Sequence, residues 1–124
     1  MDKKSIRPEL NLNATNASIE ETFQNEVLRP IIKLQHELII CNFKHFIDTI
    51  NTDFQTLKKE AQLKFIKDSL TKDLSLNNYF KGLISGLFTK DEFIFYLDHK
   101  QSINKRIIQI IEKRIVDSIS ELKK

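Results

Sequence analysis

The stretch SINKRIIQIIEKRIVDSISEL, residues 102–122, carries a large apolar residue at every third or fourth position. Residues three and four apart lie on the same side of an α-helix, so this spacing forms one apolar face. The face consists of Ile103, Ile107, Ile110, Ile111, Ile115, Ile119 and Leu122. The stretch therefore predicts a long amphipathic helix that buries one side in a helical core.

The rest of the chain also favours helices. Only two Gly and two Pro occur among 124 residues, too few for the tight turns of an all-β fold. Ser18 and Glu21 form a capping-box pattern, which predicts a first helix from there to about Thr49. Pro30 lies inside it and removes a backbone donor, so we expect a kink near this residue.

Three further helices are predicted between the first and the last. They cover about 54–72, 74–87 and 90–98, and a second capping box, Thr89 with Glu92, begins the third of these. We therefore predict an all-α, single-domain bundle of about five helices over residues 18–124. The polar, Asn-rich residues 1–17 are predicted to form a flexible N-terminal arm.

Charge and cysteine content narrow the class of protein. The net charge of +3 is well short of a strongly basic nucleic-acid footprint. The single Cys41 rules out an internal disulfide and a multi-cysteine zinc site. No apolar run approaches the ~20 residues of a membrane span, and the first residues do not read as a leader. We expect a cytoplasmic protein with no membrane partner and no cofactor.

Two stretches carry a resemblance to known proteins. LRPIIKLQ at 28–35 and GLISGLFT at 82–89, followed by Glu92 and Tyr96, resemble a group of small, poorly characterised bacterial proteins, some of which are labelled glyoxalase. The likeness spans about 20–120 and implies an all-helical bacterial domain. It supplies no catalytic residues. Because the sequence also shows no catalytic constellation, a non-enzymatic role is favoured.

The only two glycines, Gly82 and Gly86, are four residues apart in a helical stretch. Each glycine costs about 1 kcal/mol relative to alanine inside a helix, so a compensating contact is expected. Three interpretations remain open. Gly86 ends the helix in the left-handed conformation, or the pair admits a neighbouring helix of the same chain, or it admits a helix of a second copy.

A polar line, Gln35, Asn42 and Thr49, runs along the first helix at intervals of seven residues. The surrounding helix surface is apolar over more than half its circumference, which is typical of a central helix or of one covered by a second subunit. Buried amides need hydrogen-bond partners. The line is therefore an ordinary set of satisfied core amides, a dimer seam, or part of a small-ligand pocket.

Two residue sets have the chemistry for other ligands. Cys41 and His45 are one helical turn apart and could supply two metal ligands, with the others coming from elsewhere in the fold. The basic residues of the last helix, Lys105, Arg106, Lys113 and Arg114, form a possible nucleic-acid face. For both sets the alternative is a solvated helix surface, and a nucleic-acid partner is not expected.

The leading functional hypothesis is a non-enzymatic helical interaction or assembly module that self-associates as a homodimer, with a further protein partner possible. The interface candidates are Gly82, Gly86, Gln35, Asn42 and Thr49. The alternatives are a helical bundle that binds a small ligand or a metal, and a nucleic-acid-associated regulator.

Overall fold

A computed structural model describes residues 18–122, which form helices and connecting turns without a strand. The α-helices are α1 (Ile19–Phe23), α2 (Arg29–Leu34), α3 (His36–Thr49), α4 (Lys59–Lys72), α5 (Leu74–Ser85), α6 (Lys90–Asp98) and α7 (Lys100–Asp117). A π-helical turn, η2 (Gln24–Leu28), joins α1 to α2, and two 3-10 turns are η3 (Phe54–Thr56) and η4 (Ile119–Leu122). The predicted all-α, single-domain bundle is confirmed; the predicted arm at 1–17 lies outside the described residues.

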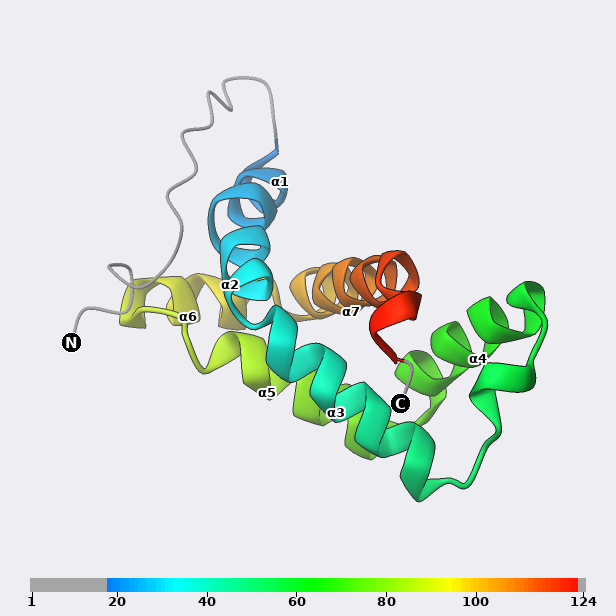
Figure 1. Cartoon of the computed structure of the whole chain (residues 1–124). Coiled ribbons are helices and arrows are strands. Elements are labelled where there is room, and N and C mark those ends of the chain that lie inside the picture. Colours follow the sequence, from blue (N-terminus) through cyan, green and yellow to red (C-terminus); the bar gives the residue numbers. More distant parts are fainter. Residues whose placement is uncertain (1–17, 123–124) are drawn as a thin grey trace.

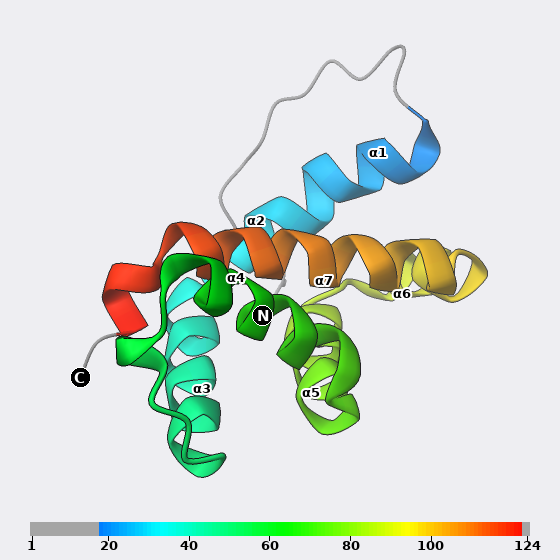
Figure 2. The ribbon, with the colours of Figure 1, turned by 90° about the vertical axis from the view of Figure 1, so that its right-hand side faces the viewer.

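Helix α7 is the centre of the bundle. It contacts α2, α3, α4, α5, α6 and η2. Figure 2 shows it crossing the molecule, with α3, α4 and α5 below it and α1 and α2 above. Four of its isoleucines are completely inaccessible to solvent, namely Ile103, Ile107, Ile111 and Ile115. The isoleucine face therefore forms the core that the sequence predicts, although the α-helix ends at Asp117 and the last apolar residues lie in η4.

The first predicted helix is interrupted twice. At η2 the backbone N–H of Arg29 donates to the carbonyl of Gln24, one residue further back than in an α-helix. This wider turn directly precedes Pro30, which has no N–H to donate, and it is the distortion expected there.

The second interruption, at Gln35, was not predicted. Its ψ angle of 9° leaves the helical region, and Figure 1 shows α3 running in a different direction from α2. The bend allows both segments to bury apolar residues, because Ile32 before it and Ile39 after it are both completely covered. One predicted helix thus becomes two separate segments, the continuous run of α1, η2 and α2 and, after the bend, α3. Counted in this way, the bundle predicted to have about five helices has six helical segments within 18–122.

Local capping signals set several helix boundaries. Thr89 Oγ1 accepts from the N–H of Glu92 at 3.2 Å, and Glu92 Oε1 accepts from the N–H of Thr89 at 2.8 Å. This complete capping box starts α6 at Lys90, as predicted. The Ser18 hydroxyl likewise accepts from the N–H of Glu21 at 3.0 Å at the start of α1.

Candidate functional site

Helix α6 carries apolar side chains on both sides, and one of these sides faces outward. Phe93, Ile94 and Leu97 are 40%, 50% and 53% exposed. Their spacing of one, three and four residues places them next to one another on a helix surface. These three residues are called the α6 face below. Contiguous exposed apolar surface of this kind is typical of an interaction site.

The inner side of α6 is fastened to the bundle. The Tyr96 hydroxyl donates to Asn104 Oδ1 of α7 at 2.6 Å. The ring of Phe95 stacks on Phe23 of α1 with centroids 4.9 Å apart, and Phe88 meets Tyr96 edge-on at 5.6 Å. In Figure 1, α6 lies at the end of the molecule opposite α4. These contacts fix the orientation of the α6 face, so it does not turn inward.

Charged residues lie at the two ends of the α6 face. Lys90 is three, four and seven residues before Phe93, Ile94 and Leu97, and so belongs to the same side of the helix. Asp98 is the last residue of α6, and both charged side chains are exposed. Asp91, also exposed, lies three residues before Ile94, so the α6 face has an apolar centre, a first turn with both a positive and a negative side chain, and a negative side chain at its last residue.

The two glycines differ in their surroundings. A Cβ added at Gly82 would meet no atom within 4 Å, whereas one added at Gly86 would lie 3.0 Å from the carbonyl oxygen of Gly82. Gly86 follows the last residue of α5 with a φ of −61°, so the left-handed cap is not formed. Gly82 is exposed and admits no neighbouring helix among the described residues. Contact with a second copy is the interpretation of Gly82 that stays a prediction.

The three residues of the polar line, which begins at the bend before α3, have different surroundings within the described part of the chain. Gln35 Nε2 donates to the carbonyl of Leu83 at 3.3 Å and so ties the bend to α5. Asn42 is half-buried, and the exposed Thr49 donates to the carbonyl of His45 in its own helix at 2.8 Å. The amide of Gln35 is thus satisfied inside the bundle; whether any of the three meets a second subunit stays a prediction.

Cys41 and His45 are exposed on the outer side of α3. Over residues 18–122 no three His, Cys, Asp or Glu side chains are grouped closely enough to hold a metal ion. The described fold thus brings no third ligand to this pair.

The four basic residues of α7 are distributed between two sides of the helix. Arg106 donates to Gln24 Oε1 at 2.8 Å, Arg114 donates to His36 Nδ1 at 3.2 Å, and Lys113 lies 3.7 Å from Asp117. Lys105 instead borders a groove between α4, α5 and α7. Arg106 and Arg114 therefore contribute to contacts within the bundle, and the four side chains form no single basic face.

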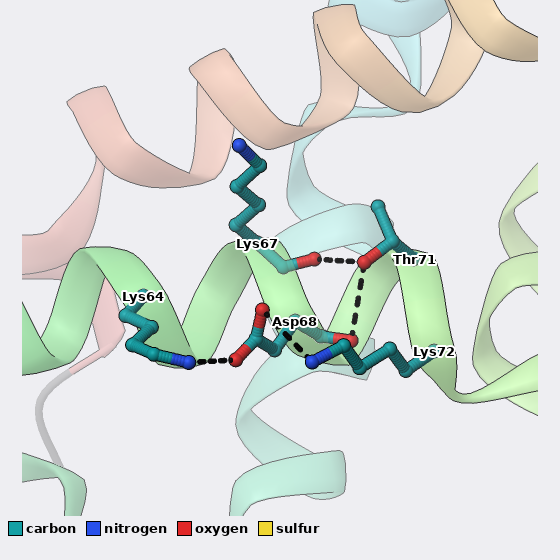
Figure 3. A network of polar contacts seen from close by, with 5 residues as sticks. All are labelled: Lys64, Lys67, Asp68, Thr71 and Lys72. Atoms are coloured by element: carbon teal, nitrogen blue, oxygen red, sulfur yellow. Dashed lines mark hydrogen bonds and ion pairs between the residues drawn. The ribbon is translucent and has the colours of Figure 1, made fainter.

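An ion network on α4 was not identified from the sequence, although its spacing of four residues is a usable signal. Asp68 lies 2.7 Å from Lys64 Nζ and 3.6 Å from Lys72 Nζ (Figure 3). The hydrogen bond from Lys64 holds the pKa of Asp68 below its ordinary value. Figure 3 also shows Lys67 pointing away from this network, toward α7. The network is an arrangement of surface ion pairs within α4.

Comparisons of the chain with known proteins identify no relative. No protein-family model matches the chain, and neither a curated protein nor a solved structure is significantly similar to it. Among the described residues, no helix combines the length and apolar character needed to cross a membrane.

Proposed function

We propose that this protein is a non-enzymatic helical interaction module that forms a homodimer through the α6 face. The observation that carries the proposal is the contiguous exposure of Phe93, Ile94 and Leu97 on a helix whose other side is firmly docked. Removing such apolar surface from water is the main favourable contribution to protein association.

The charge pattern favours a second copy as the partner. In a two-fold symmetric dimer each residue contact occurs twice, and the arrangement proposed here is the one in which the two α6 helices pack antiparallel. With the pair centred between Phe93 and Ile94, Leu97 of one copy meets the aliphatic stem of Lys90 in the other. The same arrangement brings the Lys90 ammonium toward Asp98 of the second copy. The α6 face is therefore complementary to itself in both polarity and charge.

The size of the α6 face sets the expected strength of association. Stable complexes bury roughly 1,200–2,000 Å² in total, which is more than the single face of a nine-residue helix supplies. We therefore expect a reversible dimer with a dissociation constant on the order of micromolar. Such a dimer dissociates on dilution, and this makes its interface open to mutational measurement.

Sedimentation velocity over a range of protein concentrations tests the proposal. The wild-type chain should shift from monomer to dimer as concentration rises, and Ile94→Asp should remain monomeric. Leu74→Asp is the matched control, because Leu74 is 73% exposed but lies at the start of α5. A wild-type protein that stays monomeric at millimolar concentration would contradict self-association, and equal effects of the two variants would contradict the location.

A charge exchange tests the antiparallel arrangement itself. Lys90→Asp should weaken the dimer because it places two carboxylates together, and adding Asp98→Lys should restore it. If the double variant associates no better than Lys90→Asp alone, the two ends of α6 do not meet in the dimer.

A further inference from the structure

Three lysines from three different helices border one groove of about 420 Å³. They are Lys67 of α4, Lys81 of α5 and Lys105 of α7, and these three helices pack directly against one another. Because the chain segments that carry them are distant in sequence, only the fold brings the three lysines to one groove.

These lysines differ from others on the surface of α4. Lys64 and Lys72 share the carboxylate of Asp68, whereas no carboxylate within residues 18–122 lies within ion-pair distance of Lys67, Lys81 or Lys105. One carboxylate, Glu112, also borders the groove, which leaves an excess of positive charge. Positive charges that outnumber the negative charges around one groove attract an anion.

The remaining lining supplies a hydrogen-bond donor and an apolar surface. Asn104 accepts the Tyr96 hydroxyl through Oδ1, so the group that it can offer to a ligand is its NH2, a donor. The neighbouring Asn77 is held in place because its NH2 donates to the carbonyl of Leu70 at 2.7 Å. Ile108, 8% exposed, adds apolar lining. The groove thus combines several donors with a patch for an organic group.

We propose that the groove between α4, α5 and α7 binds a small phosphate-bearing ligand, with its phosphates held by Lys67, Lys81 and Lys105. Ammonium groups bind phosphate as point charges, and several lysines at one place suit a di- or triphosphate better than a single phosphate. The groove volume lies in the range of small-molecule sites. This site does not involve the α6 face, so the phosphate-binding proposal and the dimer proposal can be tested independently.

The first experiment is an NMR titration of isotopically labelled protein with sodium pyrophosphate and, separately, with ATP, at constant ionic strength. We expect the side-chain amide signals of Asn77, Asn104 and Gln109, which line the groove, to shift. Those of Gln55 and Gln62, which bond to Leu122 and Phe54 elsewhere, should not shift. Specific shifts with both probes, or with ATP alone, support the proposal; no shift at millimolar concentration of either probe overturns it.

Matched variants separate a built site from general positive charge. Lys81→Gln and Lys105→Gln should each weaken binding about tenfold, since each removes a charge-assisted hydrogen bond. Lys64→Gln removes the same charge from a lysine of α4 that pairs with Asp68 and does not border the groove, and it should change affinity by less than about twofold. Equal weakening by Lys64→Gln would overturn the site. So would a DNA oligonucleotide that binds in a Lys81-dependent manner while pyrophosphate and ATP do not, because the groove would then be part of a nucleic-acid surface.

Discussion

Helices α6 and α7 are separated in the chain only by His99, and both are rich in large apolar residues, yet the fold uses them differently. In α7 the isoleucines are confined to one side, and helices from the rest of the bundle cover them. In α6 apolar residues occur on both sides, and the α6 face stays 40–53% exposed. The comparison shows that apolar content does not determine burial; the number of neighbours that reach a surface does.

The two helices should therefore contribute to different properties. Each buried isoleucine of α7 contributes about 1.5–3 kcal/mol by its removal from water. The exposed residues of α6 gain little on folding of the single chain, so their apolar surface remains available for association. Core substitutions and α6-face substitutions should then separate stability from self-association.

The largest effect is expected in α7. Ile107→Ala leaves a cavity at a completely buried position and should lower the free energy of unfolding by about 2–5 kcal/mol. Ile94→Ala on α6 should lower it by no more than about 0.5 kcal/mol at concentrations where the protein is monomeric. Chemical denaturation measures both values. Comparable losses for the two variants would mean that α6 is as deeply covered as α7, which would remove the distinction.

A smaller effect is expected at the capping box that starts α6. Thr89→Ala removes the side-chain acceptor of the Glu92 N–H and should cost about 1 kcal/mol in the free energy of unfolding. It should also weaken the dimer, because fraying of the first turn displaces Lys90 and Phe93. Denaturation and sedimentation on the same variant test both expectations, and an unchanged dimer would show that the first turn of α6 is outside the interface.

Gly82 of α5 and Gly86, which directly follows α5, offer a matched test. The expected change in the free energy of unfolding is similar in size to that of Thr89→Ala. Gly82→Ala should raise the free energy of unfolding by about 0.5–1 kcal/mol, because a Cβ there meets open space and alanine favours helix. Gly86→Ala should gain less, since its Cβ would lie 3.0 Å from the Gly82 carbonyl oxygen. Thermal unfolding compares the two. If Gly82→Leu dissociates the dimer while the chain stays folded, α5 also contributes to the dimer contact and the α6 face is not the whole interface.

The smallest effect is expected on α4. The exposed side of α4 is polar, whereas the exposed side of α6 is apolar. Lys64 lowers the pKa of Asp68 below the ordinary value of 3.8. The folded state therefore binds this proton less readily than the unfolded state. The ion pair therefore stabilises the folded state at pH values above the ordinary pKa of Asp68. This stabilisation is lost as the pH falls through the lowered pKa of the folded state. NMR titration of Asp68 should show the low pKa, and Lys64→Gln should raise it; an unchanged pKa would mean that the ion pair is not formed in solution.

The sequence by itself determined the helical class and several boundaries, because these depend on local chemistry. The isoleucine spacing predicts α7, and the Thr89–Glu92 capping box places the start of α6 at Lys90. A proline without an N–H makes a distortion before Pro30 predictable. Each of these signals involves residues within one or two helical turns of one another, where backbone hydrogen bonding decides the outcome.

Only the tertiary structure decided the bend at Gln35, the side of α6 that remains uncovered, and the placement of Lys67, Lys81 and Lys105 along one groove. Each depends on which helix packs against which, and periodicity along one helix carries no information about its neighbours. The apolar pattern of α6 is compatible with burial on either side, and docking on Phe23 and Asn104 selects the inner one. Both candidate sites are therefore products of long-range packing between segments whose local structure the sequence already determines.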